Sequence, residues 1–301
     1  MAQAIRTLAI RGAPLIGVAA AYGIALELAR DPSPQALEEA CHVLAGARPT
    51  AVNLRWAVER VRAAAQGAGG GAPDQAALNE AEAIRREEEL ASQAIASAGA
   101  DLLGSPRVLL THCNTGALAA PGAGTALAVV VELFRRGHLE SVLVTETRPL
   151  LQGARLTTFE LGRMGIPHEL VVDGAAPGLM AGGEVDGVVV GCDRVAANGD
   201  VANKVGTYSL ALAAHAAEIP FAVAGPTSTI DAGCPSGAEI AIEVRAPEEV
   251  RQAGGTPLAP SGTACRNPAF DVTPAGLITA LITERGTAQP VNHASVEALL
   301  G

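Results

Sequence analysis

The residue best suited to covalent or acid–base chemistry in this chain is a cysteine where an apolar run ends. Cys113 lies in LLTHCNTGALA, residues 109–119, just before a Gly-rich stretch. A thiol at that place is either a small core residue or a group that faces a ligand. Asp193, in GCDRVAANGDVANKVGT, is the second candidate. Its carboxyl could act as an acid, or it could simply cap a turn or pair with Arg194.

The distribution of positive charge is a second chemical signal. Twenty of the 21 basic residues are arginine, and Lys204 is the only lysine. A planar guanidinium does not replace a compact, flexible ammonium, so the lone lysine indicates a specific anion contact, although chance also explains it. Asn203 and Lys204 are expected to begin a helix, and helix N-termini favour anions.

Two arginines stand beside residues that allow close approach of a ligand. Arg11 precedes Gly12 and Ala13, and a glycine beside a guanidinium lets backbone and side chain both reach an oxyanion. Arg48 precedes a proline-fixed turn. Taken singly, each arginine could equally be a solvated surface charge. The Gly-rich stretch 117–127, which opens a helix, adds a weak phosphate signal.

The first part of the chain reads as helical. Residues 1–104 are predicted to form a small N-terminal domain of helices rich in small apolar residues. Ser33 and Pro34 suit the N-cap and first position of one helix. A flexible connector over residues 67–74 is expected to end at Asp74, which would cap a long helix.

The second part, residues 105–301, alternates short apolar strands with helices. The predicted strands cover residues 107–112, 141–146, 168–173, 185–191, 220–225 and 241–244, with helices over 124–137, 153–165 and 203–218. This pattern predicts a Rossmann-like, doubly wound parallel sheet, an α/β fold. Ligands bind beyond the carboxyl ends of such strands, where Cys113 and Asp193 are expected to lie. Strand alternation should turn His112 and Cys192 away from them.

Composition excludes several classes of protein. A net charge of −10 argues against a nucleic-acid binder, because phosphate backbones need a basic face. No apolar run reaches the roughly 18 residues of a membrane span, and the N-terminus lacks a signal-peptide layout. Five cysteines without paired spacings argue against a disulfide framework and favour a reducing cytoplasm. No metal site is expected.

Several long motifs together resemble the methylthioribose-1-phosphate isomerase family, related to subunits of initiation factor 2B. They are IRGAPLIGVAAAYG, RPTAVNLRWA, THCNTGALA, GTALAVV, ETRPLLQGARLTTFEL, GCDRVAANGDVANKVGT and NPAFDVTPAGLITALITERG, in this order. The resemblance implies a homodimer without a cofactor that acts on a sugar phosphate in methionine salvage. It also implies two catalytic residues, Cys113 and Asp193. The implied substrate contacts are Arg11, Gly12, Ala13, Arg48, Gln152, Asn203 and Lys204.

The chain departs from the family at two points. Members usually carry roughly forty more residues before the RGAP motif. Either the start of this sequence lies too late or the segment is absent, and the N-terminal domain as given is expected to lack it. Cys192 stands where a small residue such as alanine is expected, a mild change.

The family chemistry requires an acid, because a phosphate on the anomeric carbon prevents spontaneous ring opening. Asp193, with its pKa raised by an apolar setting, could protonate the ring oxygen. Cys113 could then remove the C2 proton as a thiolate, or it could shape the pocket for a direct hydride shift from C2 to C1. The sequence leaves both routes open.

Three other functions fit parts of the pattern. Ribose-1,5-bisphosphate isomerase would need another cationic cluster for the second phosphate, and a 5-deoxyribose-1-phosphate isomerase would differ only at C5. A non-catalytic module like those of initiation factor 2B would have no need of an acid and a thiol at one pocket.

Overall fold

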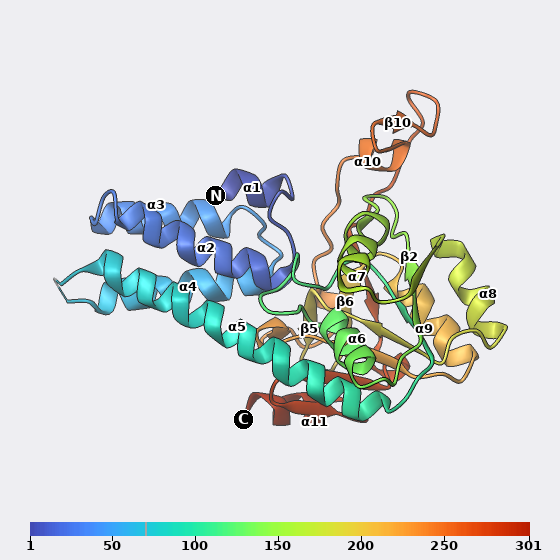
Figure 1. The fold of residues 1–301 in the computed structure, drawn as a ribbon. Helices are drawn as coiled ribbons and strands as arrows, with labels where there is room; N and C mark the ends of the chain where they lie inside the picture. The colour runs from blue at the N-terminus through green and yellow to red at the C-terminus, as the bar shows by residue number, and fades with distance from the viewer. Residues whose placement is uncertain (70) are drawn as a thin grey trace.

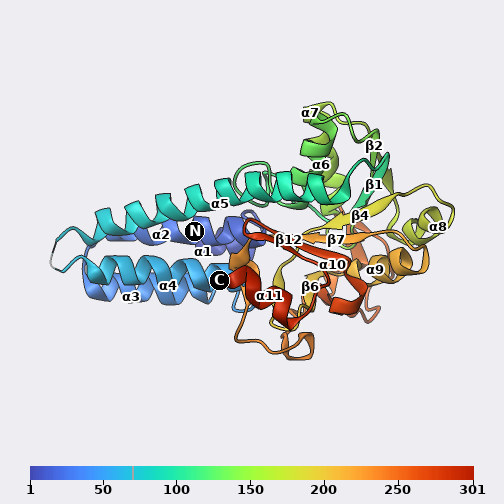
Figure 2. The ribbon, with the colours of Figure 1, turned by 90° about the horizontal axis from the view of Figure 1, so that it is seen from below.

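The computed structural model describes residues 1–69 and 71–301 and joins a helical part to an α/β part (Figures 1 and 2). The helical part contains α1 (Ala2–Arg6), α2 (Ala13–Leu28), α3 (Pro34–Ala45), α4 (Val52–Gly67) and α5 (Pro73–Leu103). Its core consists of small and aliphatic side chains, with Ile16, Ile24 and Leu54 almost fully buried. Small residues let these helices approach closely, as the composition predicts.

The predicted helix starts are partly correct. Ser33 is the N-cap of α3, accepting a hydrogen bond from the backbone N–H of Ala36 at 3.2 Å, and Pro34 follows as the first helical residue. Asp74 is not a cap, because α5 already begins at Pro73, a residue that suits the first turn. Of the predicted connector 67–74, position 70 lies outside the described residues.

Helix α5 joins the two parts (Figure 1). Its first half buries Ala77, Ala81 and Ile84 in the core of the helical part, and its second half buries Ile95 and Ala100 beside the sheet. One continuous helix therefore fixes the two cores relative to each other. The division into domains at residues 104 and 105 stays a prediction.

A seven-stranded sheet forms the centre of the α/β part. Its strand order is β13-β12-β7-β4-β1-β2-β3, with every pair parallel except β13 with β12. The strands are β1 (Val108–Thr111), β2 (Ser141–Thr145), β3 (His168–Val171), β4 (Gly187–Val190), β7 (Phe221–Ala224), β12 (Ala280–Thr283) and β13 (Gly286–Ala288). This order confirms the doubly wound α/β fold.

Helices flank the sheet, as the alternating pattern predicts. They are α6 (Ala126–Arg135), α7 (Thr158–Met164) after a π-helical turn η1 (Gly153–Thr157), α8 (Ala176–Ala181), α9 (Thr207–Ala216) and α11 (His293–Leu300). The short helix α10 (Glu248–Arg251) lies apart from the sheet, on a projecting segment (Figure 1). Short 3-10 turns are η2 (Asp173–Ala175), η3 (Thr227–Thr229), η4 (Gly237–Glu239) and η5 (Ala275–Leu277). The strands beneath them, β4 and β7 above all, are buried along their whole length.

One strand prediction is wrong, and one strand of the sheet was not predicted. Residues 241–244 form no strand of the large sheet: Val244 is 75% exposed and makes one isolated bridge with Pro268, because the backbone around it pairs with residues 267–269 instead. The sixth parallel strand is instead β12, whose four residues are all buried. Its apolar run reads equally well as a helix without the tertiary context.

A second, four-stranded sheet has the order β11-β6-β5-β8. Its strands are β5 (Arg194–Ala196), β6 (Val201–Lys204), β8 (Ile230–Asp231) and β11 (Phe270–Thr273). Asn203 and Lys204 therefore end a strand and do not begin a helix as predicted, because β6 pairs on both sides while α9 starts only at Thr207. A small hairpin, β9 (Gln252–Ala253) and β10 (Thr256–Pro257), projects beside α10 (Figure 1).

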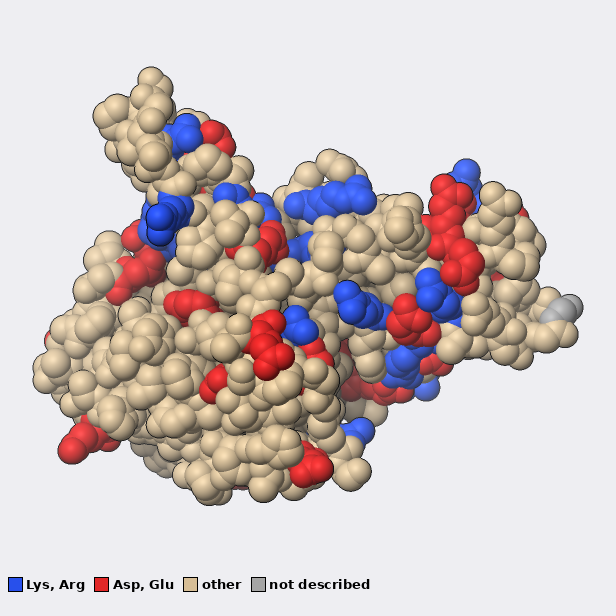
Figure 3. All heavy atoms as spheres, turned by 180° about the vertical axis from the view of Figure 1, so that it is seen from behind, with Lys and Arg blue, Asp and Glu red and all other residues tan. Residues whose placement is uncertain are grey.

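Charge on the surface is mixed in sign. On the face drawn in Figure 3, arginine side chains lie interspersed with acidic ones over the helical part, and much of the α/β part carries neither. Within the described ranges, none of the helices is long and apolar enough to cross a membrane.

A buried carboxyl lies between the two parts. Glu88 of α5 is 6% exposed and accepts a hydrogen bond at 2.9 Å from the hydroxyl of Ser228, in η3. That hydroxyl accepts in turn from the amide of Asn53, in α4, at 2.8 Å. Burial raises the pKa of Glu88 to about 7, and the neighbouring carboxylate of Glu284 adds to the rise. The folded state therefore favours the protonated acid.

Replacing Glu88 should make stability less dependent on pH. An unfolded glutamate ionises near pH 4.3, so wild-type stability falls as pH rises from there through 7. Glu88→Gln keeps an acceptor for Ser228 but cannot ionise. Its free energy of unfolding relative to wild type should rise by about 2–3 kcal/mol between pH 5 and pH 8. Urea denaturation at both pH values measures this, with the exposed Glu39→Gln as control. An equal pH response of the two variants would contradict it.

Candidate active site

Cys113 and Asp193 follow two neighbouring strands of the large sheet. Cys113 comes just after β1 and Asp193 just after β4, and these strands pair in parallel. In the order β12-β7-β4-β1-β2-β3 this pair is where the chain reverses its direction of winding, the place where such sheets bind ligands. Both residues line the same two cavities. The structure thus brings the predicted thiol and acid together.

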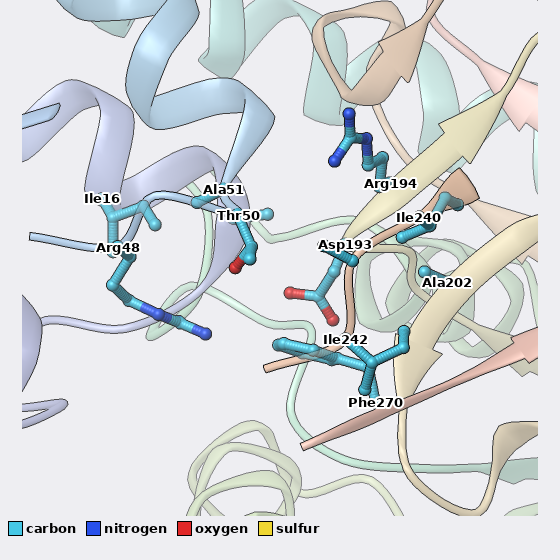
Figure 4. A pocket seen from close by; sticks show the side chains of 12 residues that line it. Ile16, Arg48, Thr50, Ala51, Asp193, Arg194, Ala202, Ile240, Ile242 and Phe270 are labelled. Carbon is cyan, nitrogen blue, oxygen red and sulfur yellow. The ribbon is translucent and has the colours of Figure 1, made fainter. Parts of the chain in front are cut away.

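Three adjoining hollows meet at Asp193. The cationic cavity is lined by Leu8, Arg11, Gly12, Arg48, Cys113, Gln152, Asp193, Lys204, Arg245 and Phe270. The inner cavity includes Ala13, Cys113, Asn114, Cys192, Asp193 and Asn203. The apolar recess is lined mainly by Ala13, Ile16, Ala51, Ala202, Ile240, Ala241, Ile242 and Phe270, and its polar lining residues are Arg48, Thr50, Asp193 and Arg194 (Figure 4). All nine predicted site residues line at least one of them.

The backbone of Cys113 is held in an unusual conformation. Its φ is +65°, in the left-handed region that non-glycine residues rarely adopt. Two hydroxyls fix it there: the N–H donates to Oγ1 of Thr147 at 2.8 Å, and the carbonyl accepts from Oγ1 of Thr157 at 2.6 Å. Such conformations cluster at functional sites, where neighbouring contacts over-determine them. Here the contacts hold Cys113 in the cavity wall.

Arg11 is fixed next to the thiol. Its guanidinium donates to Oδ1 of Asn114, to the carbonyl of Asn114 at 3.1 Å, and to the sulfur of Cys113 at 3.9 Å. The amide of Asn114 donates at 2.7 Å to the buried carboxylate of Glu160, in α7. A chain of contacts from Glu160 through Asn114 therefore sets the position of the cation beside the sulfur.

Gly12 permits a close backbone approach next to Arg11. Its φ is +100°, and a Cβ at this position would overlap the backbone of Ala119. The backbone N–H of Leu15 donates to the carbonyl of Ala119 at 3.2 Å, which joins the start of α2 to the loop after Cys113. Only glycine allows this contact without displacement.

Asp193 is a buried acid among cations. Burial raises the pKa of Asp193, and the charges of Lys204, Arg48 and Arg11 oppose that rise only in part. Figure 4 shows its carboxyl directed into the hollow toward Arg48, whereas Arg194 points away. Arg194 pairs with Asp231 instead. The simple pairing of Asp193 with Arg194 is therefore not what the structure shows.

Lys204 is also buried, at 9% exposure. Its ammonium donates to the carbonyl of Ala269 at 2.7 Å. Burial lowers the pKa of Lys204, against the opposing effect of Cys113 and Asp193, while Arg48 and Arg11 lower it further. The site thus carries more positive than negative charge around the cavity and suits an anion.

The remaining predicted contacts occupy different walls. Gln152 lines the cationic cavity, and its side-chain oxygen is buried without a hydrogen-bond partner, so it is free for a ligand. Ala13 lines the inner cavity and the apolar recess. Asn203 lines only the inner cavity, where its amide donates to Thr207 at 2.9 Å.

Of the two residues expected to point away, His112 does so, whereas Cys192 lines the inner cavity as well as packing in the core. His112 is 1% exposed, and its ring nitrogens contact Oγ1 of Thr145 at 2.6 Å and the carbonyl of Val205 at 2.9 Å. Cys192 packs in the core cluster of β4 and β7, with Oγ1 of Thr229 at 3.4 Å. Burial raises the pKa of Cys192 to about 12, so this thiol stays neutral.

Sequence reasoning missed several residues of the site. Asn114, Arg245 and Phe270 line the cavities but received no role. Asn114 directly follows Cys113 in the chain, and this position next to a candidate catalytic residue could have identified it. Arg245 and Phe270 reach the site only because the segment before β11 folds back, and nothing in their local sequence indicates it.

The arrangement offers an acid, a thiol and several cations around one cavity. It is suited to general acid–base chemistry on a small anionic molecule. Among residues 1–69 and 71–301, no group of three or more His, Cys, Asp or Glu side chains is placed to hold a metal ion.

Comparisons with known proteins match nearly the whole chain to one family. The model of the Initiation factor 2 subunit family matches residues 9–290. Methylthioribose-1-phosphate isomerase of Anaeromyxobacter sp. (strain K) is 53% identical over 99% of this chain and 87% of its own length. The enzyme of the same name from Alcanivorax borkumensis is 50% identical over 99% and 87%.

Solved structures give the same picture. The crystal structure of 5-methylthioribose 1-phosphate isomerase from Pyrococcus horikoshii OT3 matches with a TM-score of 0.90 and 40% identity, covering 99% of this chain and 86% of that one. A structure of translation initiation factor eIF-2B, subunit delta, from A. fulgidus has a TM-score of 0.86 and 40% identity, covering 99% and 89%.

Adding a side chain at Gly12 should push the start of α2 away from the loop that follows Cys113 and contains Ala119. Gly12→Ala places a methyl group on the backbone of Ala119 and should lower the free energy of unfolding by about 3 kcal/mol. Gly67→Ala is the matched control, because its Cβ meets no atom within 4 Å in the last turn of α4. It should stabilise by at most about 1 kcal/mol. Urea denaturation compares them, and similar effects in both would contradict the proposed close approach.

Proposed function

The chain belongs to the Initiation factor 2 subunit family, and we propose that it converts 5-methylthioribose 1-phosphate to 5-methylthioribulose 1-phosphate in methionine salvage. This is an aldose–ketose isomerisation. The observation that carries the proposal is that Cys113 and Asp193 line one cavity together with Arg11, Arg48 and Lys204. The relatives that are about half identical bear the name of this enzyme.

The hollows around Asp193 match the two ends of this substrate. The phosphate would bind the cations of the cationic cavity, with Gly12 and Gln152 adding polar contacts, and Asn203 would contact the sugar from the inner cavity. The methylthio group would enter the apolar recess, with Ala13 where the recess meets the inner cavity. A second phosphate, as in ribose 1,5-bisphosphate, would find only apolar side chains over most of that recess. The recess therefore favours a substrate with an apolar C5 substituent.

Asp193 would open the sugar ring. As a protonated acid it gives its proton to the ring oxygen while the bond from that oxygen to C1 breaks. Burial raises the pKa of Asp193, so a larger share of the carboxyl carries the needed proton. The carboxylate left behind can accept the proton that leaves the C2 hydroxyl when the ketone forms. Asp193 thus ends the cycle in its starting state.

Cys113 would act on the hydrogen at C2. As a thiolate it can take the C2 proton, and the electron pair left behind forms a C1–C2 double bond that is later protonated at C1. The guanidinium of Arg11, 3.9 Å from the sulfur, would favour the negative charge. The alternative is a direct hydride shift from C2 to C1, for which Cys113 would only shape the cavity.

The proposal also covers the oligomeric state and the cellular compartment of the enzyme. We propose a homodimer in the cytoplasm, as the family resemblance and the odd number of cysteines suggest. A regulatory role without catalysis is the second candidate, because a structure at 40% identity is described as a translation initiation factor subunit. Turnover decides between them.

The purified protein should turn over 5-methylthioribose 1-phosphate in preference to its C5 analogues. A panel with methylthio, hydrogen, hydroxyl and phosphate at C5 tests this by kcat/KM. We expect the methylthio substrate to exceed the bisphosphate by about 10³-fold or more, since a C5 phosphate would be buried against a mainly apolar wall. The two arginines that line the recess, Arg48 and Arg194, are already paired with Glu243 and Asp231. No turnover of any member would favour the regulatory role.

Cys113→Ser and Asp193→Asn should each lower kcat by about 10²–10⁴-fold while largely preserving substrate binding. Both substitutions keep size and remove only the proton-transfer function. Arg107→Gln is the control, because Arg107 precedes β1, at the end of that strand opposite to Cys113, and its side chain is 68% exposed. Near-wild-type rates in either catalytic variant would show the assigned role to be wrong.

The reaction of the wild type in deuterated water distinguishes the two routes for the hydrogen at C2. Deuterium from the solvent at C1 of the product would exclude a pure hydride shift.

A further inference from the structure

Strand register places an aromatic ring against the only lysine. Phe270 and Lys204 are direct cross-strand partners in the antiparallel pair β11 and β6. Their side chains therefore lie on one face, and the ammonium is 4.5 Å from the ring centroid. The carbonyl of Ala269, just before the ring, accepts a hydrogen bond from the same ammonium. One short segment thus fixes Lys204 in two ways.

The same ring also contacts a cation from the helical part. The guanidinium carbon of Arg48 lies 5.7 Å from the centroid of Phe270. Its Nη2 pairs with Glu243 at 2.6 Å, while its Nε is buried without a partner. Figure 4 shows Phe270 and Arg48 at the edge of the hollow that receives Asp193. Two cations from distant segments therefore meet on one aromatic side chain.

A neutral ring is suited to this place for an electrostatic reason. Two buried cations repel each other, and the structure shows this as a lowered pKa of Lys204, caused first by burial and also by Arg48. The negative face of an aromatic ring attracts both cations without neutralising them. A carboxylate in its place would attract them more strongly but would compete with an anionic ligand. The ring adds no further negative charge beside Glu243, so Lys204 keeps its charge for the ligand and Arg48 is offset by one carboxylate only.

We propose that Phe270 is a positioning residue that holds Arg48 and Lys204 as a pair for the phosphate of the substrate. This inference rests on the proposed function for the identity of the phosphate ester. It assigns a role to a side chain that touches the cations and not the reacting carbons. Its contribution lies in binding and not in the chemical step.

Graded fluorination of the ring tests this role. Phenylalanine with zero, one, two or three ring fluorines is inserted at position 270 of the full chain, which weakens the negative face stepwise with little change in shape. The KM for methylthioribose 1-phosphate should rise steadily, to about tenfold for the trifluoro ring, with kcat nearly unchanged. The inhibition constant of inorganic phosphate should rise in parallel.

Phe221 provides the matched control. It is 1% exposed in β7, and among the described residues no cation lies over its ring. The same series at position 221 should leave KM unchanged. A flat series at position 270, or an equal rise at both positions, would overturn the proposal.

The role of Phe270 can still be tested if the proposed substrate is wrong. If the wild type turns over no sugar phosphate, the binding of inorganic phosphate is measured by titration calorimetry across both series. A graded loss at position 270 alone would then support the role of the ring, while an unchanged or absent phosphate affinity would overturn it.

Discussion

The parallel pairing of β1 with β4 is the constraint on which the site depends. These strands are adjacent at the point where the winding of the sheet reverses, so the loops after them diverge and leave space at their carboxyl ends. Cys113 and Asp193 are the residues found there, 80 positions apart in the chain. Were another strand inserted between β1 and β4, the thiol and the acid would be separated by an additional strand spacing of about 4.8 Å.

The site also depends on a balance of buried charge. Arg11, Arg48 and Lys204 surround Asp193, yet burial still raises the pKa of that carboxyl and lowers the pKa of the lysine. Burial thus disfavours both the carboxylate of Asp193 and the ammonium of Lys204. The protonated form of Asp193 that results is the form that can act as a general acid. Glu243 offsets only part of the positive charge of Arg11, Arg48 and Lys204, so the site favours an anion.

Three parts of the chain must be held together for this site to exist. The helical part contributes Arg11 and Arg48, the large sheet contributes Cys113 and Asp193, and the small sheet contributes Lys204. Helix α5 joins the first two through packing in both cores. The hydrogen-bonded group around Glu88 adds a polar contact between the same parts. Stability at this boundary is therefore linked to the geometry of the site.

The sequence by itself determined the α/β class, five of the six parallel strands, and Cys113 and Asp193 as candidates, because apolar runs and the residues after them are local features. The lone lysine and the arginines beside glycine or proline also marked Lys204, Arg11 and Arg48 as candidate anion contacts, and the family motifs added Gln152. Only the tertiary structure decided that β12 is the sixth strand, that Lys204 ends a strand, and that Phe270 lies beneath two cations. These facts depend on pairing between segments far apart in the chain, and local sequence carries no record of which partner a strand will find.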